Sequence, residues 1–375
     1  MFIDSFKQHF ESVADPRQSA KVTYPFFDIL FGSLCAVIAG AHGWFDIREY
    51  LLGHHKWFLE LGMFKAGIPA DDTIARTISA IKPEQFQACF LKWMAAVHTL
   101  TQGELIAIDG KTLRGSYNRE DRSSTIHMIS AYATANKLVL GQLKTDKKSN
   151  EITAIPELLQ LLDLQGALVS IDAMACQTKI AKTIIEQKGD YLLAVKGNQG
   201  NLSKAVQQAF SALRNDASSL EALQTEKQHG RIESRLCQVL DASTLEGNFS
   251  RWKGLKTLAM ITSFRTEKGK PVSMEYRYYI SSRIMSAEQV ASAVREHWAI
   301  ESMHWVLDVS MQEDACQIYK DHAAENLACL RHLALNMLRA EPTKLSIVGK
   351  QKRCWMKTEH LEKVLIAGLS VLLKN

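Results

Sequence analysis

Two short apolar segments of the sequence each end in an aspartate. LIAID ends at Asp109 and LVSID ends at Asp172, and both are typical of buried β-strands. In open α/β sheets, ligands bind beyond the carboxyl ends of the strands. If the two strands are parallel neighbours, their carboxylates lie close together and repel each other unless a cation lies between them. Hard oxygen ligands of this kind suit Mg²⁺, although Asp109 alone could simply begin an Asp-Gly turn.

A third set of polar residues occurs in the segment REHWAIESMHWVLDV. On a helix, at ~100° per residue, four of them fall on one stripe: His297, Glu301, His304 and Asp308. The other faces are mostly apolar, so the helix should be buried, and a buried acidic stripe must be paired, solvated or metal-bound. Two alternatives stay open. The stripe could face solvent, or it could hold Zn²⁺ by itself, although its spacing is not the HExxH pattern.

The intervening segments predict a mixed α/β architecture. Residues 1–98 show the three- and four-residue apolar spacing of helices. After Gly103 the order of elements is β-β-β-α-β-α-β-α, which indicates a sheet covered by helices on both faces. Residues from about 224 to 283 form strand-like runs that predict an antiparallel β insertion, and helices return from Ser286.

The composition is that of an ordinary globular chain. With 46% hydrophobic and 23% charged residues, it excludes disorder, collagen and coiled coil as the main architecture. Seven cysteines without a CxxC pair predict reduced thiols in a cytoplasmic protein. No signal peptide is predicted, and the longest charge-free apolar run is 13 residues, between Asp28 and His42. That is short of the ~20 residues that span a bilayer, so no membrane is expected as a partner.

The net charge of +5 is concentrated at the C-terminal end. Residues 339–375 hold 8 basic and 3 acidic residues, whereas the first 338 balance at 37 basic and 37 acidic. A local excess favours a polyanion as partner, with Lys350, Lys352 and Arg353 as candidate phosphate contacts. A solvated helix face accounts for the same pattern equally well.

Five stretches together resemble the DDE-type insertion-sequence transposases, most closely the H-repeat-associated proteins linked to rearrangement hot spots. They occur in the family's order and the resemblance covers nearly the whole chain: AIDGKTLRGS (107–116), SIDAMACQ (170–177), DYLLAVKGNQ (190–199), HGRIESR (229–235) and HWAIESMHWVLDVSMQEDA (297–315). The resemblance implies a ribonuclease-H-like catalytic domain over residues 99–340, including the β insertion. A helical transposase-associated domain at 1–98 would precede it, and a basic helical tail at 341–375 would follow.

The resemblance also implies the chemistry. Asp109, Asp172 and Glu301 would be the catalytic, metal-binding triad, separated by 63 and 129 residues. The expected reaction is cleavage and strand transfer at the ends of a double-stranded DNA element by a homo-oligomer. Two Mg²⁺ or Mn²⁺ ions would lower the pKa of the nucleophile and neutralise the leaving oxygen. Two alternatives are a catalytically silent relic that only binds DNA, and a metal-dependent nuclease without strand transfer.

Further residues are predicted around this triad. Five basic side chains would contact DNA phosphates: Lys111, Arg114, Lys196, Arg231 and Arg235. In HGRIESR, cross-strand ion pairing is an equally good interpretation. His297, His304 and Asp308 would orient or shield the carboxylates. The wider class often has Tyr and Arg before the catalytic Glu and Lys after it, where this chain has Val294, His297 and Asp308. DNA contacts inferred from that pattern are therefore not transferred.

Overall fold

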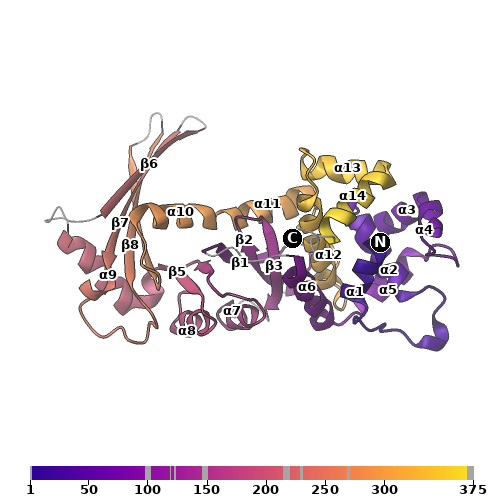
Figure 1. Cartoon of the computed structure of the whole chain (residues 1–375), viewed down its shortest axis with the longest axis horizontal. Coiled ribbons are helices and arrows are strands. Elements are labelled where there is room, and N and C mark those ends of the chain that lie inside the picture. Colours follow the sequence, from indigo (N-terminus) through magenta and orange to yellow (C-terminus); the bar gives the residue numbers. More distant parts are fainter. Residues whose placement is uncertain are drawn as a thin grey trace.

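A long mixed β-sheet forms the centre of the molecule. The structure is a computed structural model that describes residues 2–97, 103–118, 120–121, 124–145, 151–213, 220–228, 231–267 and 271–369. Within these residues the strand order is β3-β2-β1-β4-β5-β9-β8-β7-β6 (Figure 1). The strands are β1 Leu105–Leu113, β2 Ile126–Ala133, β3 Leu138–Thr145, β4 Leu168–Ile171, β5 Asp190–Val195, β6 Leu220–Gln228, β7 Arg231–Asp241, β8 Thr257–Glu267 and β9 Ser273–Ser281. The predicted mixed α/β class is confirmed.

The first five strands are covered by helices on both faces. β1, β4 and β5 run parallel, and β2 and β3 form antiparallel pairs beside β1. Helices α7 (Glu151–Gln160) and α8 (Thr178–Glu186) lie on one face, and α10 (Ala287–His297) and α11 (Ala299–Ser310) lie across the other (Figure 1). Burial on both faces explains why these strands are continuous apolar runs rather than alternating ones.

The β insertion continues the same sheet. β9 pairs with β5 in antiparallel fashion, and β8, β7 and β6 follow outward as a twisted blade between α10 and α9 (Gly200–Leu213) (Figure 1). The sequence predicts three strands from about 224, whereas the structure has four, beginning at Leu220. β6 was missed because its sequence, LEALQTEKQ, contains Glu, Lys and Ala, which are depleted in strands.

Helices from both ends of the chain share one core. The N-terminal helices are α1 Phe2–Phe10, α2 Phe26–Ile38, α3 Trp44–Gly53, α4 His55–Glu60, α5 Asp71–Ser79 and α6 Pro83–Val97; the C-terminal ones are α12 Ala323–Ala340, α13 Ile347–Met356 and α14 Thr358–Leu369. Helix α12 packs on α2, α5 and α6, and α14 packs on α1. The Trp93 indole of α6 donates to the Gly368 carbonyl of α14 at 3.2 Å and so also links the two ends of the chain. We call this assembly the helical body.

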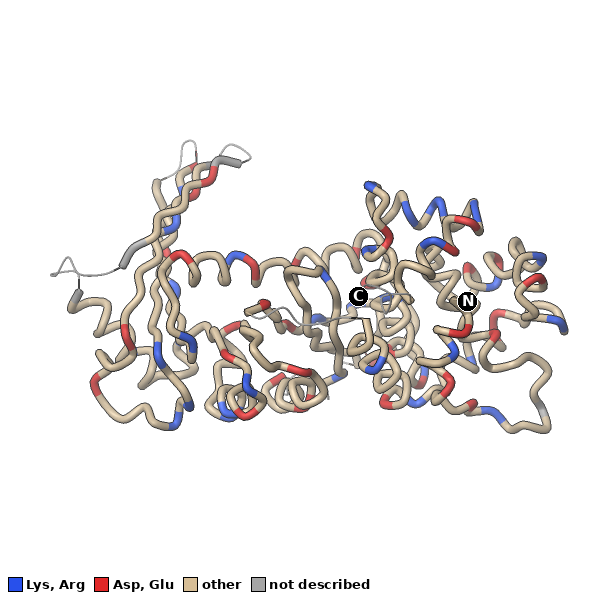
Figure 2. The backbone as a smooth tube through the Cα atoms, viewed as in Figure 1, with Lys and Arg blue, Asp and Glu red and all other residues tan. Residues whose placement is uncertain are grey.

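The basic C-terminal segment is part of the helical body. Lys350 is buried, donates to the carbonyl of Leu338 at 2.7 Å and lies 3.2 Å from a Glu341 oxygen. The structure therefore contradicts its prediction as a phosphate contact, because its charge is used inside the protein. Lys352 and Arg353 are exposed on α13, where Figure 2 shows blue segments of the tube.

No helix in the described ranges is both long enough and apolar enough to cross a membrane.

Candidate active site

The pairing of β1 with β4 brings the two predicted aspartates together. The parallel register aligns Ile108 with Ile171. The residues that follow them, Asp109 and Asp172, therefore lie side by side. Contrary to the predicted turn, β1 does not end at Asp109. It continues through Gly110 to Leu113 because β2 supplies hydrogen-bonding partners along that length. Asp109 is therefore held inside a strand, whereas Asp172 directly follows one.

The third carboxylate comes from the helices across the sheet. Ser286 is the N-cap of α10, as the sequence predicts, and it also forms a capping box with Gln289. The segment from 286 to 308, predicted as one helix, is divided at Trp298 into α10 and α11. Glu301 lies in the first turn of α11 and lines a cavity of about 310 Å³ together with Asp172.

Asp109 lies in an environment that disfavours its negative charge. Burial, together with the nearby carboxylates of Asp172, Glu151 and Glu301, raises its pKa to about 7. The N–H of Gly110 donates to Asp109 Oδ1 at 2.9 Å and partly opposes this effect. Glu151, the first residue of α7, is a carboxylate that the sequence analysis did not identify, since nothing in its local pattern places it near Asp109.

The chemistry of these donors fits a divalent cation. Among the described residues, no group of three or more His, Cys, Asp or Glu side chains is arranged so that it could hold a metal ion. The side chains that converge on Asp109 nevertheless supply carboxylate oxygens, and their mutual repulsion is what a bound cation would relieve. Oxygen donors favour Mg²⁺ or Mn²⁺, whereas Zn²⁺ sites draw on imidazole and thiolate.

The two histidines of the predicted stripe contact different partners. His297 Nδ1 lies 2.8 Å from Ser170 Oγ, and burial lowers the pKa of His297 while Asp172 opposes the shift. His304 Nδ1 lies 3.6 Å from Asp109 Oδ2, and burial lowers the pKa of His304 to about 3. Both imidazoles are therefore neutral neighbours of the aspartates at neutral pH, and they do not converge on a site of their own.

Lys111 is enclosed by carboxylates. Its side chain is 10% exposed, and its ammonium contacts Asp308 and lies 2.5 Å from Glu313 and 3.9 Å from Asp314. Burial alone would raise the pKa of Glu313, but Lys111 and other nearby cations hold it below its usual value. We call these four residues the Lys111 cluster. The structure thus places Lys111 and Asp308 in an internal ion pair between β1 and α11, so the charge of Lys111 is compensated within the protein.

The other predicted DNA contacts differ in availability. Arg114 is 82% exposed, with Asp314 at 3.5 Å, and Lys196 is exposed just after β5 and lines the cavity beside Asp172. Arg235 is ion-paired with Glu233 of its own strand at 2.9 Å and with Glu226 of β6 at 3.5 Å, and the second pair is the cross-strand pairing that the alternative interpretation of HGRIESR expects. The side chain of Arg231 and all of His229 lie outside the described residues.

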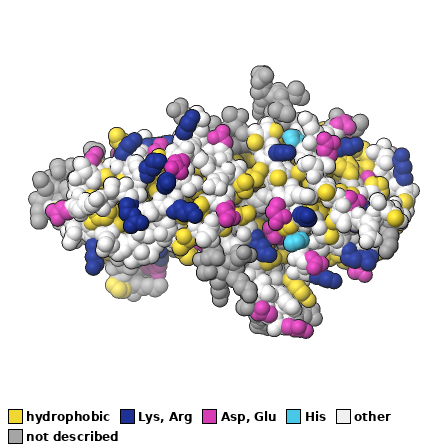
Figure 3. Space-filling view, turned by 90° about the horizontal axis from the view of Figure 1, so that it is seen from below, with side chains coloured by type: hydrophobic (Ala, Val, Ile, Leu, Met, Phe, Trp, Pro, Cys, Tyr) yellow, Lys and Arg dark blue, Asp and Glu magenta, His cyan; other side chains and the backbone are white. Residues whose placement is uncertain are grey.

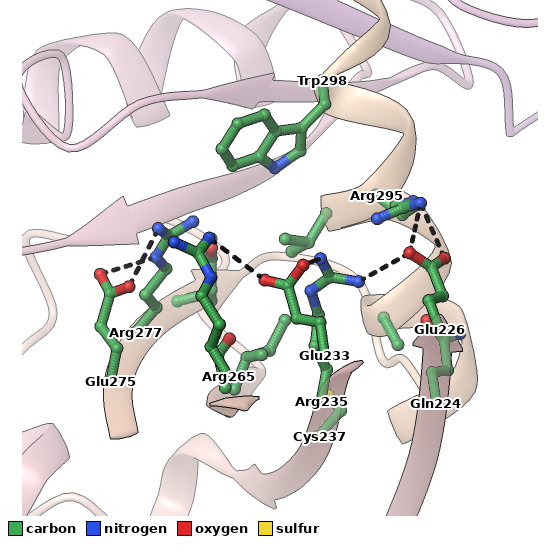
Figure 4. A pocket seen from close by; sticks show the side chains of 15 residues that line it. Gln224, Glu226, Glu233, Arg235, Cys237, Arg265, Glu275, Arg277, Arg295 and Trp298 are labelled. Atoms are coloured by element: carbon green, nitrogen blue, oxygen red, sulfur yellow. Dashed lines mark hydrogen bonds and ion pairs between the residues drawn. The ribbon is translucent and has the colours of Figure 1, made fainter. Parts of the chain in front are cut away.

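The inner face of the insertion carries alternating charges. Arginines and glutamates of the four strands and α10 form a row of ion pairs beside Trp298 (Figure 4). Arg295 lies 2.7 Å from Glu226, and the Arg277 guanidinium lies 5.6 Å from the Trp298 ring centre. The row lines a cavity of about 250 Å³ that shares Arg277 and Trp298 with the cavity beside Asp172. We call this set of ion-paired side chains the Arg–Glu row; its members are Glu226, Glu233, Arg235, Arg265, Glu275, Arg277 and Arg295.

The structure also has a basic surface that the sequence does not predict. Side chains of α8 and of the segment before β8 line a shallow hollow: Thr178, Lys179, Lys182, Ser250, Arg251 and Lys253. The underside of the molecule shows several Lys and Arg side chains on the half that carries the insertion (Figure 3). Its members come from two distant segments, and neither segment is a basic run by itself.

Comparison with known proteins defines the class. The family model described as "Transposase DDE domain" matches residues 100–337, and the model described as "DDE_Tnp_1-associated" matches residues 7–94. The chain therefore belongs to the DDE-domain transposase family, which confirms the resemblance inferred from the five motifs.

Within that family the similarity is to H-repeat-associated proteins. The chain is 45% identical over 379 residues to "H repeat-associated putative transposase YhhI" of Escherichia coli strain K12, covering 99% of this chain and 100% of the relative. It is 46% identical over 377 residues to "Putative transposase YncI" of Escherichia coli O157:H7, covering 97% and 95%. A solved piggyBac transposase synaptic complex with hairpin DNA matches 100% of this chain and 85% of that chain at a TM-score of 0.47 and 13% identity, too weak a likeness for a functional conclusion.

Proposed function

We propose that this protein is a DNA transposase that binds the ends of its element and catalyses metal-dependent cleavage and strand transfer. Asp109, Asp172 and Glu301 are its catalytic residues. The observation that carries the proposal is the register of β1 with β4, which sets the two aspartates side by side. Glu301 supports it, because it lines a cavity with Asp172 and its charge acts on Asp109.

The organisation of the chain follows the same proposal. Residues 99–340 form a ribonuclease-H-like catalytic domain in which adjacent strand ends and a crossing helix supply the carboxylates. Residues 1–98 form the transposase-associated domain, and 341–375 form a basic helical tail. The protein assembles as a homo-oligomer on DNA, because two element ends have to be held together during transfer.

The residues of the site have distinct tasks. The three carboxylates would hold Mg²⁺ or Mn²⁺, which would activate an attacking oxygen and neutralise charge on the leaving oxygen. His297, fixed by Ser170, and His304, next to Asp109, orient the aspartates without adding charge. The same site can cut and then join, since the attacking group is water in the first step and a DNA 3′-hydroxyl in the second.

Amide substitutions test the triad. Asp109→Asn, Asp172→Asn and Glu301→Gln keep the side-chain shape but remove a charged ligand, so each should abolish Mg²⁺-dependent cleavage of element-end DNA and preserve binding. Glu359→Gln, on an exposed position of α14, is the matched control and should cleave normally. Full cleavage by any of the three variants would remove that residue from the site. Cut ends without joined product would identify a nuclease, and binding without cleavage in the unmodified chain would identify a relic.

The exposed cations provide a separate test of DNA binding. We propose that Arg114 and Lys196 contact phosphates near the carboxylates, since both are exposed and Lys196 lines the cavity beside Asp172. Reversal to glutamate should weaken binding to any sequence and flatten the logarithmic salt dependence by about 0.9 per lost contact. An unchanged salt slope would show that neither residue contacts DNA.

A further inference from the structure

A hydrogen-bonded His–Glu pair lies against the strand that carries Asp109. Glu151, at the start of α7, has Oε1 2.5 Å from His127 Nε2. His127 is on β2 opposite Thr112, and its Nδ1 lies 2.9 Å from Thr112 Oγ1. Hydrogen bonds on both ring nitrogens fix the imidazole, and the imidazole in turn fixes the orientation of the Glu151 carboxylate.

Gly110 explains how the carboxylate comes so close to β1. A Cβ at this position would overlap Glu151 Oε1 and would lie 2.5 Å from His127 Nε2. Gly110 is within a strand and its φ is not in the left-handed region, so an alanine could adopt its backbone conformation. The glycine allows the close approach of another group, because any larger residue would displace the end of the Glu151 side chain. The result is a carboxylate packed against the residue that directly follows Asp109.

The pair is arranged as metal-binding carboxylates commonly are. A ligating carboxylate usually has a second hydrogen bond from a neighbouring group, which sets its orientation. Mg²⁺ and Mn²⁺ take oxygen ligands, and three triad carboxylates leave positions open for others. An ordinary surface ion pair has no need to lie against a strand backbone, and it would not require a glycine beneath it.

We propose that Glu151, oriented by His127, is a fourth carboxylate of the metal site and a ligand of the divalent cation beside Asp109. This inference rests on the proposed function, because it assumes that Asp109 binds a metal. It assigns a role to the glycine of AIDGKT, namely to admit this carboxylate.

Metal binding can be measured without activity. Titration of the full chain with Mn²⁺, in the absence of DNA, would be followed by calorimetry and by the electron paramagnetic resonance of free Mn²⁺. Glu151→Gln should weaken binding by about tenfold or more, since the uncharged amide is a poorer ligand. Glu157→Gln, at an exposed position on the same helix, should leave the affinity unchanged. Thermal unfolding without metal checks that each variant is folded.

Gly110→Ala separates ligation from charge. This variant keeps all four carboxylates, but the new methyl group displaces Glu151, so Mn²⁺ affinity should fall about as far as in Glu151→Gln. If both variants bind as tightly as the unmodified chain while Asp109→Asn binds weakly, Glu151 is only a structural partner of His127 and this inference is wrong. If Asp109→Asn also binds normally, the metal site of the proposed function is wrong as well.

Discussion

Two charged clusters lie two residues apart on β1 and have opposite character. Asp109 is surrounded by other carboxylates, whereas Lys111 is surrounded by groups of opposite charge. Both side chains point to the same face of the strand, toward α11. The Lys111 cluster satisfies its charges internally and fixes α11 on the sheet. The Asp109 site leaves like charges together, which is costly without a ligand and is therefore the mark of a binding site.

The largest expected change in the free energy of unfolding comes from disrupting the Lys111 cluster. Lys111→Met keeps much of the apolar stem but leaves Asp308, Glu313 and Asp314 without their cation. Removing one partner of a buried ion pair typically destabilises by about 3–5 kcal/mol, and urea unfolding should show a loss in this range. Lys320→Met, at an exposed position, should change the free energy of unfolding by less than about 0.5 kcal/mol. A similarly small loss for Lys111→Met would contradict the internal role of this lysine.

Low pH should destabilise the folded protein through a buried histidine next to the Lys111 cluster. His332 of α12 is buried, and burial lowers its pKa to about 4. The unfolded chain binds this proton near pH 6.5, so the folded state loses stability as pH falls from about 6.5 to 4, by about 3 kcal/mol in total. Urea unfolding of His332→Gln should show a shallower decline over this range.

The control for that experiment is His322, which is exposed at the start of α12. His322→Gln should reproduce the pH dependence of the unmodified chain. Identical slopes for all three proteins would show that His332 takes up its proton equally well in the folded and unfolded states.

A substitution of Asp109, whose neighbouring carboxylates repel it, should stabilise the folded protein rather than destabilise it. The pKa of Asp109, about 7, is above its unfolded value, so the ionised carboxylate costs the folded state stability as pH rises from about 4 through 7. Asp109→Asn should therefore stabilise the metal-free protein by about 1–3 kcal/mol at pH 8 and by much less at pH 4. Chelator-treated protein is needed, since a bound cation would conceal the gain. Destabilisation at pH 8 would mean that the carboxylate is satisfied, as Lys111 is.

Substitutions in the Arg–Glu row should change the free energy of unfolding least. Its charges are paired like those of the Lys111 cluster, but Arg295 is 46% exposed and Glu226 is 33% exposed. Exposed ion pairs contribute about 0–1 kcal/mol, so Arg295→Gln should cost less than about 1 kcal/mol in thermal or urea unfolding. A loss as large as that of Lys111→Met would show that pairing alone, without burial, determines stability in this protein.

The sequence predicted the elements of the site better than the contacts between them. Apolar runs ending at Asp109 and Asp172 and the polar stripe with Glu301 were visible because strand and helix periodicity is local. The continuation of β1 through Asp109-Gly110 was not, since a β2 ladder overrides the turn preference of this pair. The partners of Lys111 lie about 200 residues away along the chain, near Glu313, and no local pattern specifies such a pairing.

Other omissions have the same physical origin. Glu151 lies at the start of an ordinary amphipathic helix, and only the folded chain shows that its carboxylate rests on Gly110. The sequence does not predict α13 as a helix of its own within the basic tail, because the basic residues of IVGKQKRCWM weaken the apolar pattern. The sequence predicts Lys350 as a surface cation, whereas the fold buries its ammonium against the end of α12.

The helical body has a consequence for the synthesis of this protein. Helix α2 is almost entirely apolar, and it packs on α12, which begins 285 residues after α2 ends (323 − 38). At about 5–20 residues per second, a ribosome needs roughly 15–60 s to deliver the partner of α2. During that interval the nascent chain presents an uncovered apolar surface to chaperones and proteases. A gene interrupted before α12 would therefore yield a polypeptide marked for degradation rather than a stable N-terminal fragment.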